Sequence, residues 1–124
     1  MRLTDERPAG LLLVHAYTPG EIRIGDTRLT RSVLLAHDRL ITDWRPQRLA
    51  ELTASDLEPI IALEPAIVVI GTGTRQQFPA HELLATLLMR RIGCEVMDTG
   101  TACGTYNLLA SEDRRVVAAL LLAD

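Results

Sequence analysis

Short runs of alternating apolar and polar residues fill the first third of the chain, which is typical of β-strands. Gly25-Asp26 separates two such runs and predicts a tight hairpin with one solvated face. Thr18-Pro19-Gly20 ends the run before the hairpin, and Pro46 ends the run after it. Strands are predicted over residues 11–17, 21–24, 27–30, 32–36 and 40–44.

In the rest of the chain, segments with apolar residues at helical spacing alternate with continuous apolar runs. Residues 66–70 and 116–122 are wholly apolar and predict buried strands, with a shorter strand over 94–97. Leucines at helical spacing predict a helix that Pro79 begins and Gly93 ends. A helix over 102–110 should follow, and strand–helix–strand order makes the strands parallel.

A short helix is predicted between the strand-rich half and the first buried strand. Thr53 or Ser55 can cap it, and Asp56 suits its first turn. Pro59 would then lie in the first turn, and Glu64-Pro65 would end the helix. The predicted fold is a single α/β domain over residues 1–124: a three-layer β/β/α-type domain with a central mixed sheet, helices on one side and extra N-terminal strands.

Composition narrows the classes of function. The chain has 124 residues and a net charge of −3, and all thirteen basic residues are arginines scattered along it. This distribution argues against nucleic-acid binding. The N-terminus carries acids and the apolar runs are short, so we expect no membrane insertion and a cytoplasmic location. Cys94 and Cys103 lack metal-ligand spacing, so we expect free thiols, no metal and no cofactor.

Two polar loops follow predicted strands, and they lie side by side if those strands are neighbours in the sheet. We call them the loop pair: residues 71–75, Gly-Thr-Gly-Thr-Arg, and residues 98–101, Asp-Thr-Gly-Thr. Both lie at carboxyl ends of strands and lead into helices, so an anion or small ligand is one prediction. The alternative is structural: the glycines permit turns, and Thr99 or Thr101 caps a helix. The third glycine of a dinucleotide fingerprint and a Walker lysine are both missing.

The candidate ligand-binding residues extend beyond the loops. Tyr106 and Asn107 in the last helix either fix the shape of the Gly71 loop by hydrogen bonds or point into the cleft; the structural role is favoured. The full predicted set is Gly71, Thr72, Gly73, Thr74, Arg75, Thr99, Gly100, Thr101, Tyr106 and Asn107.

No residue is assigned to catalysis. Cys103 near a helix start would be a stabilised thiolate with His81 as the nearest candidate base, but a buried cysteine as a small hydrophobe is the better interpretation. A hydrolase that uses Cys103 or Thr101 is therefore the least favoured class.

Four segments together resemble a small family of unknown function over nearly the whole chain: residues 70–73, 75–79, 97–100 and 105–112. Relatives in this family include the mitochondrial complex I assembly factor three and an adipogenesis-associated protein. The resemblance implies a three-layer fold around a mixed sheet with one strand antiparallel to the rest, and no established catalytic activity. The family often has arginine where Gln77 stands and a basic residue where Gly104 stands, so positive charge is lost beside the loop pair.

The leading hypothesis is a non-catalytic binding or assembly-factor-like domain that recognises a protein partner. The alternative is a small-molecule or anion-binding domain that uses the loop pair. A homodimer through hydrophobic edge strands of the N-terminal half is a further prediction.

Overall fold

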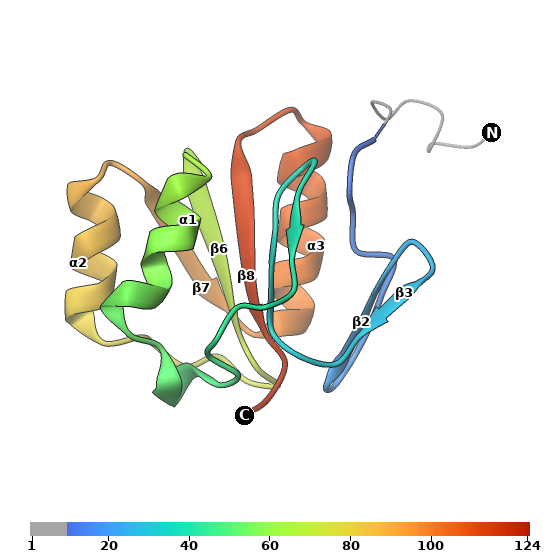
Figure 1. The fold of residues 1–124 in the computed structure, drawn as a ribbon, viewed down its shortest axis with the longest axis horizontal. Coiled ribbons are helices and arrows are strands. Elements are labelled where there is room, and N and C mark those ends of the chain that lie inside the picture. The colour runs from blue at the N-terminus through green and yellow to red at the C-terminus, as the bar shows by residue number, and fades with distance from the viewer. Residues whose placement is uncertain (1–9) are drawn as a thin grey trace.

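The computed structural model describes residues 10–124, which form two β-sheets and three α-helices (Figure 1). A three-stranded antiparallel sheet has the order β1-β2-β3, and a five-stranded sheet has the order β5-β4-β8-β6-β7. The strands are β1 (Ala16–Thr18), β2 (Glu21–Ile24), β3 (Thr27–Leu29), β4 (Val33–Leu35), β5 (Leu40–Ile41), β6 (Ile67–Thr72), β7 (Gly93–Met97) and β8 (Val116–Leu121). The helices are α1 (Glu58–Ala62), α2 (His81–Met89) and α3 (Thr99–Ser111), with 3-10 helices η2 (Leu49–Glu51) and η3 (Ala54–Leu57) before α1.

One strand of the five-stranded sheet runs against all the others. β4 is antiparallel to β5 and to β8, whereas β6 is parallel to β7 and to β8. The hairpin predicted around Gly25-Asp26 is β2–β3, and the pair predicted before Pro46 is β4–β5. The mixed α/β fold class and the single antiparallel strand are therefore confirmed.

Helices cover both faces of the five-stranded sheet, which differs from the expected arrangement on one side. Val68 and Ile70 pack in one core cluster with residues of α1 and α2. Val69 packs in the other cluster with Ala102 and Tyr106 of α3 and with residues of the three-stranded sheet. The connection from β6 to β7 and the return from β7 to β8 cross the sheet in opposite directions. Because such crossovers are right-handed, their helices must lie on opposite faces (Figure 1).

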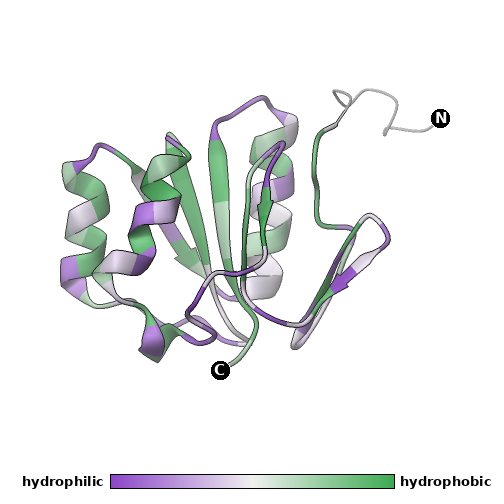
Figure 2. Cartoon of the chain, viewed as in Figure 1, coloured by the Kyte–Doolittle hydropathy of each residue, from purple (hydrophilic) through white to green (hydrophobic). Residues whose placement is uncertain are grey.

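Burial follows the strand order. Every residue of β8 is buried because β8 lies between β4 and β6 with both faces covered. Figure 2 shows β6 and β8 as hydrophobic along most of their length. None of the helices in the described part of the chain is long and apolar enough to cross a membrane.

The ends of α2 differ from the prediction. Pro79 precedes the helix, whose N-cap is Ala80, so proline does not occupy the first helical position. The helix ends at Met89, and the chain turns at Arg91, which has a left-handed φ of 61°. Gly93 is already the first residue of β7. The leucine stripe continues to Ile92 because this turn keeps Ile92 in the same core cluster as Leu83 and Leu87.

The start of the η3–α1 helical segment is capped as predicted. Thr53 and Asp56 form a reciprocal capping box, with the Thr53 backbone N–H donating to Asp56 Oδ2 at 2.8 Å. Arg45 adds an ion pair from its Nη2 to Asp56 Oδ2 at 2.7 Å. Pro59 lies at the start of α1, where a missing N–H is tolerated.

The apolar run predicted as a strand over 11–17 is extended chain in its first part. Only Ala16–Thr18 pairs with β2. The Leu12 carbonyl accepts from the Tyr106 hydroxyl and the Val14 N–H donates to the Asn107 side chain, while the Leu12 N–H donates to the His37 carbonyl. An apolar pattern alone does not distinguish a segment held by a sheet from one held by side chains.

Candidate functional site

The loop pair lies at the carboxyl ends of β6 and β7, which are neighbours in the sheet. The Gly73 N–H donates to Thr99 Oγ1 at 2.8 Å, and the Thr99 N–H donates to the Gly73 carbonyl at 2.8 Å. The Thr99 hydroxyl in turn donates to the Leu121 carbonyl at 2.6 Å. One buried threonine thus ties together the ends of β6, α3 and β8.

Gly71 sets how closely α3 approaches the sheet. A Cβ atom placed on Gly71 would lie 2.9 Å from both the Cα and the Oγ1 of Thr99, and 3.1 Å from the Cβ of Ala102. Glycine is the residue that permits this distance. Its role is therefore packing of strand against helix, which supports the structural alternative for this position.

Asp124 holds the first loop from the end of β8. Its Oδ1 accepts from the Thr74 N–H at 2.7 Å, and its Oδ2 accepts from the Thr74 hydroxyl at 2.6 Å. These bonds, together with nearby Arg75, hold the pKa of Asp124 below its usual range. Gly73 has a φ of 107°, and a Cβ there would collide with Asp124 Oδ1. Asp124 was not among the predicted site residues, because nothing in its local sequence signals a contact with residue 74.

Asp98 is the N-cap of α3, in place of the predicted Thr99 or Thr101. Its Oδ2 accepts from the Thr101 N–H at 3.0 Å, and its Oδ1 accepts from the Thr101 hydroxyl at 2.7 Å. Hydrogen bonds from Thr101 lower the pKa of Asp98. The helix therefore begins at Thr99, three residues earlier than predicted.

Internal bonds also shape the first loop on its other side. Thr72 is buried, and its Oγ1 lies 2.7 Å from the Arg75 carbonyl and accepts from the Gln77 N–H at 3.1 Å. Arg75 and Thr74 are exposed. The loop pair therefore carries one carboxylate, Asp98, and one arginine, and Asp124 beyond β8 adds a second carboxylate against Thr74. This charge balance opposes binding of a free anion. The ligand site predicted for these residues stays a prediction.

Tyr106 and Asn107 direct their side-chain hydrogen bonds to the N-terminal segment of the described chain, away from the Gly71 loop. The Tyr106 hydroxyl donates to the Leu12 carbonyl at 2.8 Å. The Asn107 side chain donates to the Val14 carbonyl at 2.8 Å and accepts from the Val14 N–H at 2.9 Å. Both residues have the favoured structural role, but toward the N-terminal segment, which short-range patterns cannot show.

The environment of Cys103 opposes nucleophilic chemistry. Because α3 starts at Thr99, Cys103 lies beyond the first turn, and its side chain is buried among core residues. Burial raises the pKa of the Cys103 thiol to about 12, the opposite of a stabilised thiolate. Within residues 10–124, no cluster of His, Cys, Asp or Glu could hold a metal ion.

A second candidate surface lies at the free edge of β7, where α2 and β7 enclose a groove of about 420 Å³. The groove is mostly apolar, and two of its lining residues are unusually exposed: Phe78 at 71% and Leu88 at 73%. Leucines at helical spacing predicted the helix but did not show that Leu88 would be exposed. One signal in the sequence was available: Leu88 makes the apolar stripe of the helix wider than the face that a helix usually buries.

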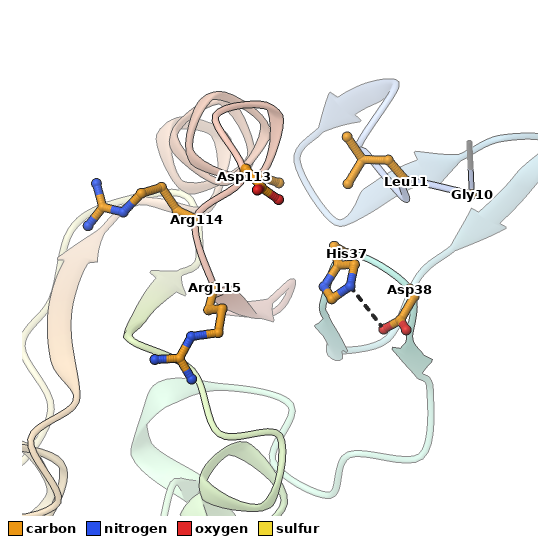
Figure 3. Close-up of a pocket in the computed structure, with 8 residues that line it drawn as sticks. Gly10, Leu11, His37, Asp38, Asp113, Arg114 and Arg115 are labelled. Atoms are coloured by element: carbon orange, nitrogen blue, oxygen red, sulfur yellow. Dashed lines mark ion pairs between the residues drawn. The ribbon is translucent and has the colours of Figure 1, made fainter. Parts of the chain in front are cut away.

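A smaller pocket of about 190 Å³ opens at the far end of α3 (Figure 3). His37 Nε2 lies 3.8 Å from Asp38 Oδ1, and both side chains are exposed. In Figure 3, Arg114 points away from this pair, and Arg115 donates to the Glu64 carbonyl at 2.9 Å. Asp113 also lines the pocket, but among the described residues the ion pair of His37 is with Asp38, so we assign this pocket no chemistry.

Comparison with known proteins gives a family match over most of the chain. The model of the family described as "Protein of unknown function (DUF498/DUF598)" matches residues 14–121. A Danio rerio protein named NADH dehydrogenase [ubiquinone] 1 alpha subcomplex assembly factor 3 is 34% identical over 96% of this chain and 68% of its own length. The "13 kDa major membrane protein" of Francisella tularensis subsp. holarctica (strain LVS) is 30% identical over 94% of this chain and 95% of its own.

Solved structures share the fold. A crystal structure from Bordetella parapertussis has a TM-score of 0.86 at 39% identity and covers 93% of this chain and 99% of that chain. A solution structure from Bordetella pertussis, described as a Mth938-like domain, has a TM-score of 0.83 at 31% identity and covers 100% of this chain and 94% of that chain. The resemblance to a complex I assembly factor is confirmed, whereas the adipogenesis-associated relative stays a prediction.

Proposed function

Because this chain belongs to the DUF498/DUF598 family of proteins of unknown function, we propose that it is a non-catalytic, assembly-factor-like domain that recognises a protein partner. The name of the Danio rerio relative, an assembly factor, supports this class of role. The chain spans about two thirds of that relative, so the proposal takes over the kind of role and leaves the identity of the complex aside.

The observation that carries the proposal is the internal pairing of the loop pair. Asp98, Thr99 and Asp124 accept the hydrogen bonds that an incoming ligand would otherwise receive from Thr101, Gly73 and Thr74. The buried Cys103 thiol, whose pKa is raised, offers no nucleophile nearby. In this loop pair the hydrogen bonds hold backbone N–H groups in place, and they join no nucleophile to a base.

Affinity capture from the organism of origin tests the proposal. The tagged chain should recover the same protein in replicate captures with brief chemical cross-linking, and the tagged partner should recover the chain in return. A chain that recovers no reproducible partner under these conditions would contradict the proposal.

A second candidate function follows from the bonds between Thr74 and Asp124. They show that the first loop can hold a carboxylate, so an acidic small ligand could replace Asp124 there. The variant Asp124→Ala would free both donors. Thermal-shift measurements of this variant with acetate and other carboxylates should then show a stabilisation that Asp124→Ala,Thr74→Val lacks. Gly73→Val is unsuitable as a control, because Gly73 has a φ of 107°, where a valine is strained whatever the space around it.

A further inference from the structure

We propose that the free edge of β7, with the apolar groove beside it, binds an extended segment of the protein partner that adds to the sheet antiparallel to β7. This inference rests on the proposed function, because it names the surface and the chemistry by which the partner is recognised. The proposed segment has apolar residues at alternate positions and an acidic residue at its C-terminal end.

The edge of β7 that faces away from β6 carries backbone N–H and carbonyl groups that pair with no other described strand. Among the described strands, β7 has β6 as its only neighbour. The Gly93 N–H donates to the Ala66 carbonyl before β6 at 3.0 Å, so Gly93 faces β6. Since alternate residues of a strand direct their backbone groups to the same side, those of Cys94 and Val96 face outward. Such an edge is a template for pairing with another chain.

One of these outward groups is already covered. The Gln76 side chain donates from Nε2 to the Val96 carbonyl at 2.9 Å. The N–H and carbonyl of Cys94 and the N–H of Val96 remain directed outward. A partner strand of a few residues can form hydrogen bonds with these three groups. Gln76 covers the next group along the edge, the Val96 carbonyl, and so ends the open stretch.

The groove lies on the side of β7 toward which Cys94 and Val96 point. Both side chains pack against the core cluster that includes Leu83 and Leu87 of α2. Phe78, Leu84, Leu88 and Ile92 complete the apolar lining. Alternate side chains of an added strand fall on this same face, so its backbone would bind the edge while its apolar side chains enter the groove.

Positive charge at the beginning of β7 favours a particular residue type at one end of the added segment. Arg90 and Arg91 are exposed in the turn that leads into Gly93, at the beginning of β7. Antiparallel pairing is the more stable arrangement for short strands, and it places the C-terminal end of the added strand at the end of β7 where these arginines lie. The same arginines also line a hollow with Glu64 and Arg115 beside the start of β6. An acid at the C-terminal end of the added strand complements Arg90 and Arg91, whereas a lysine would be repelled.

A second copy of this chain fits the edge less well. Two copies that pair through the outward groups of Cys94 and Val96 would be centred on Glu95, which is exposed. Glu95 of one copy would then lie directly opposite Glu95 of the other. Like charges at opposed positions destabilise an antiparallel pair, so a different protein is the favoured occupant.

The test uses the full chain and a capped peptide, Val-Thr-Val-Thr-Val-Asp. Amide hydrogen exchange by NMR should slow about tenfold or more at Cys94 and Val96 with excess peptide, while Glu95, whose N–H faces β6, changes little. Replacing Asp by Lys in the peptide should weaken binding. No change at Cys94 and Val96, even at millimolar peptide, would overturn the inference.

Two exposed leucines provide a matched pair of variants. Leu88→Ser removes a groove side chain, whereas Leu108→Ser changes an exposed leucine on α3, on the other face of the sheet. We expect Leu88→Ser to weaken the peptide about tenfold and Leu108→Ser to leave binding unchanged. Equal effects would overturn the inference, and so would slowed exchange at Cys94 and Val96 caused by self-association without peptide.

The same variants separate this inference from the proposed function. If Leu88→Ser and Leu108→Ser each recover as much partner as the unaltered chain does, the proposed function stays intact and the β7 site is overturned. Failure of the unaltered chain to recover any partner would instead contradict the proposed function.

Discussion

At the scale of single residues, glycines in this chain have opposite packing environments. Gly71 lies where the backbone of β6 approaches α3, and a Cβ there would press against Thr99 and Ala102. Gly104 lies on the exposed side of α3, and a Cβ there would meet nothing within 4 Å. The residue type alone does not reveal which glycine is required, because the difference is set by the neighbour across the sheet.

Alanine substitutions at these two glycines should therefore change stability in opposite directions. Gly71→Ala should destabilise the protein by about 1–3 kcal/mol through overpacking. Gly104→Ala should stabilise it by about 0.5–1 kcal/mol, because alanine favours helix. Urea unfolding midpoints measure both, and a Gly71→Ala variant as stable as the parent would show that the contact between β6 and α3 is loose.

The thiols should react slowly in the folded protein. Burial raises the pKa of Cys94 to about 11 and of Cys103 to about 12, so at neutral pH the thiolate fraction of either is at least about a hundredfold below that of an ordinary cysteine. Labelling followed by peptide mass spectrometry should find both thiols protected in buffer and reactive in urea. Rapid labelling of Cys103 in buffer at neutral pH would contradict its burial and revive the hydrolase hypothesis.

At the scale of elements, carboxylates begin two of the helical segments. Asp98 caps α3, and Asp56 completes the capping box with Thr53 before α1. Asp56 is buried and also pairs with Arg45. Each carboxylate satisfies backbone donors that would otherwise have no partner at the start of a helix.

The stability of the η3–α1 segment should depend on acid through Asp56. The hydrogen bond from Arg45 is the main cause of the lowered pKa of Asp56 in the folded protein. Its stabilisation is therefore present above the unfolded pKa, about 3.9, and is lost as the pH falls through the folded value. Asp56→Asn should cost about 1–3 kcal/mol at neutral pH and reduce the loss of stability in acid.

Exposed Asp43 offers the control for this measurement. Asp43→Asn should leave the unfolding free energy nearly unchanged at neutral pH. If urea titrations between pH 7 and pH 3 gave the same curve for Asp56→Asn and for the parent, the ion pair would not contribute to acid sensitivity.

At the scale of the whole molecule, α3 joins the two sheets. One of its faces packs on β6 and β8, and Tyr106 and Asn107 hold the chain that leads into β1. The three-stranded sheet completes its burial against the same core cluster, through Ile22 and Ile24. The small sheet therefore depends on α3 for its attachment.

Loss of the Asn107 side chain should loosen the small sheet first. Asn107→Ala leaves the Val14 N–H and carbonyl without their side-chain partner and should cost about 1–3 kcal/mol. Hydrogen exchange should accelerate more at Ile22 and Ile24 than in β8. Leu108→Ala, at the exposed neighbouring position, should change neither the stability nor the exchange rates. If Asn107→Ala instead accelerates exchange equally in both sheets, the two sheets unfold as one unit.

The candidate site was predictable in part. The loop pair was expected side by side because carboxyl ends of parallel neighbours meet at one edge, and the bonds between Gly73 and Thr99 show that arrangement. The bond between Asp124 and Thr74 was not predictable, because 50 residues separate the two. The free edge of β7 was equally hidden, since an edge exists only once the strand order is known.

The sequence by itself determined the local elements: the hairpin at Gly25-Asp26, the buried strands β6 and β8, and a helix start capped at Thr53 or Ser55. Each follows from turn chemistry or apolar spacing within a few residues. Only the tertiary structure decided which face each helix covers, which glycine must remain glycine, and which strand edge stays open. These properties depend on contacts between segments distant in sequence, and a pattern that repeats every two to four residues carries no record of them.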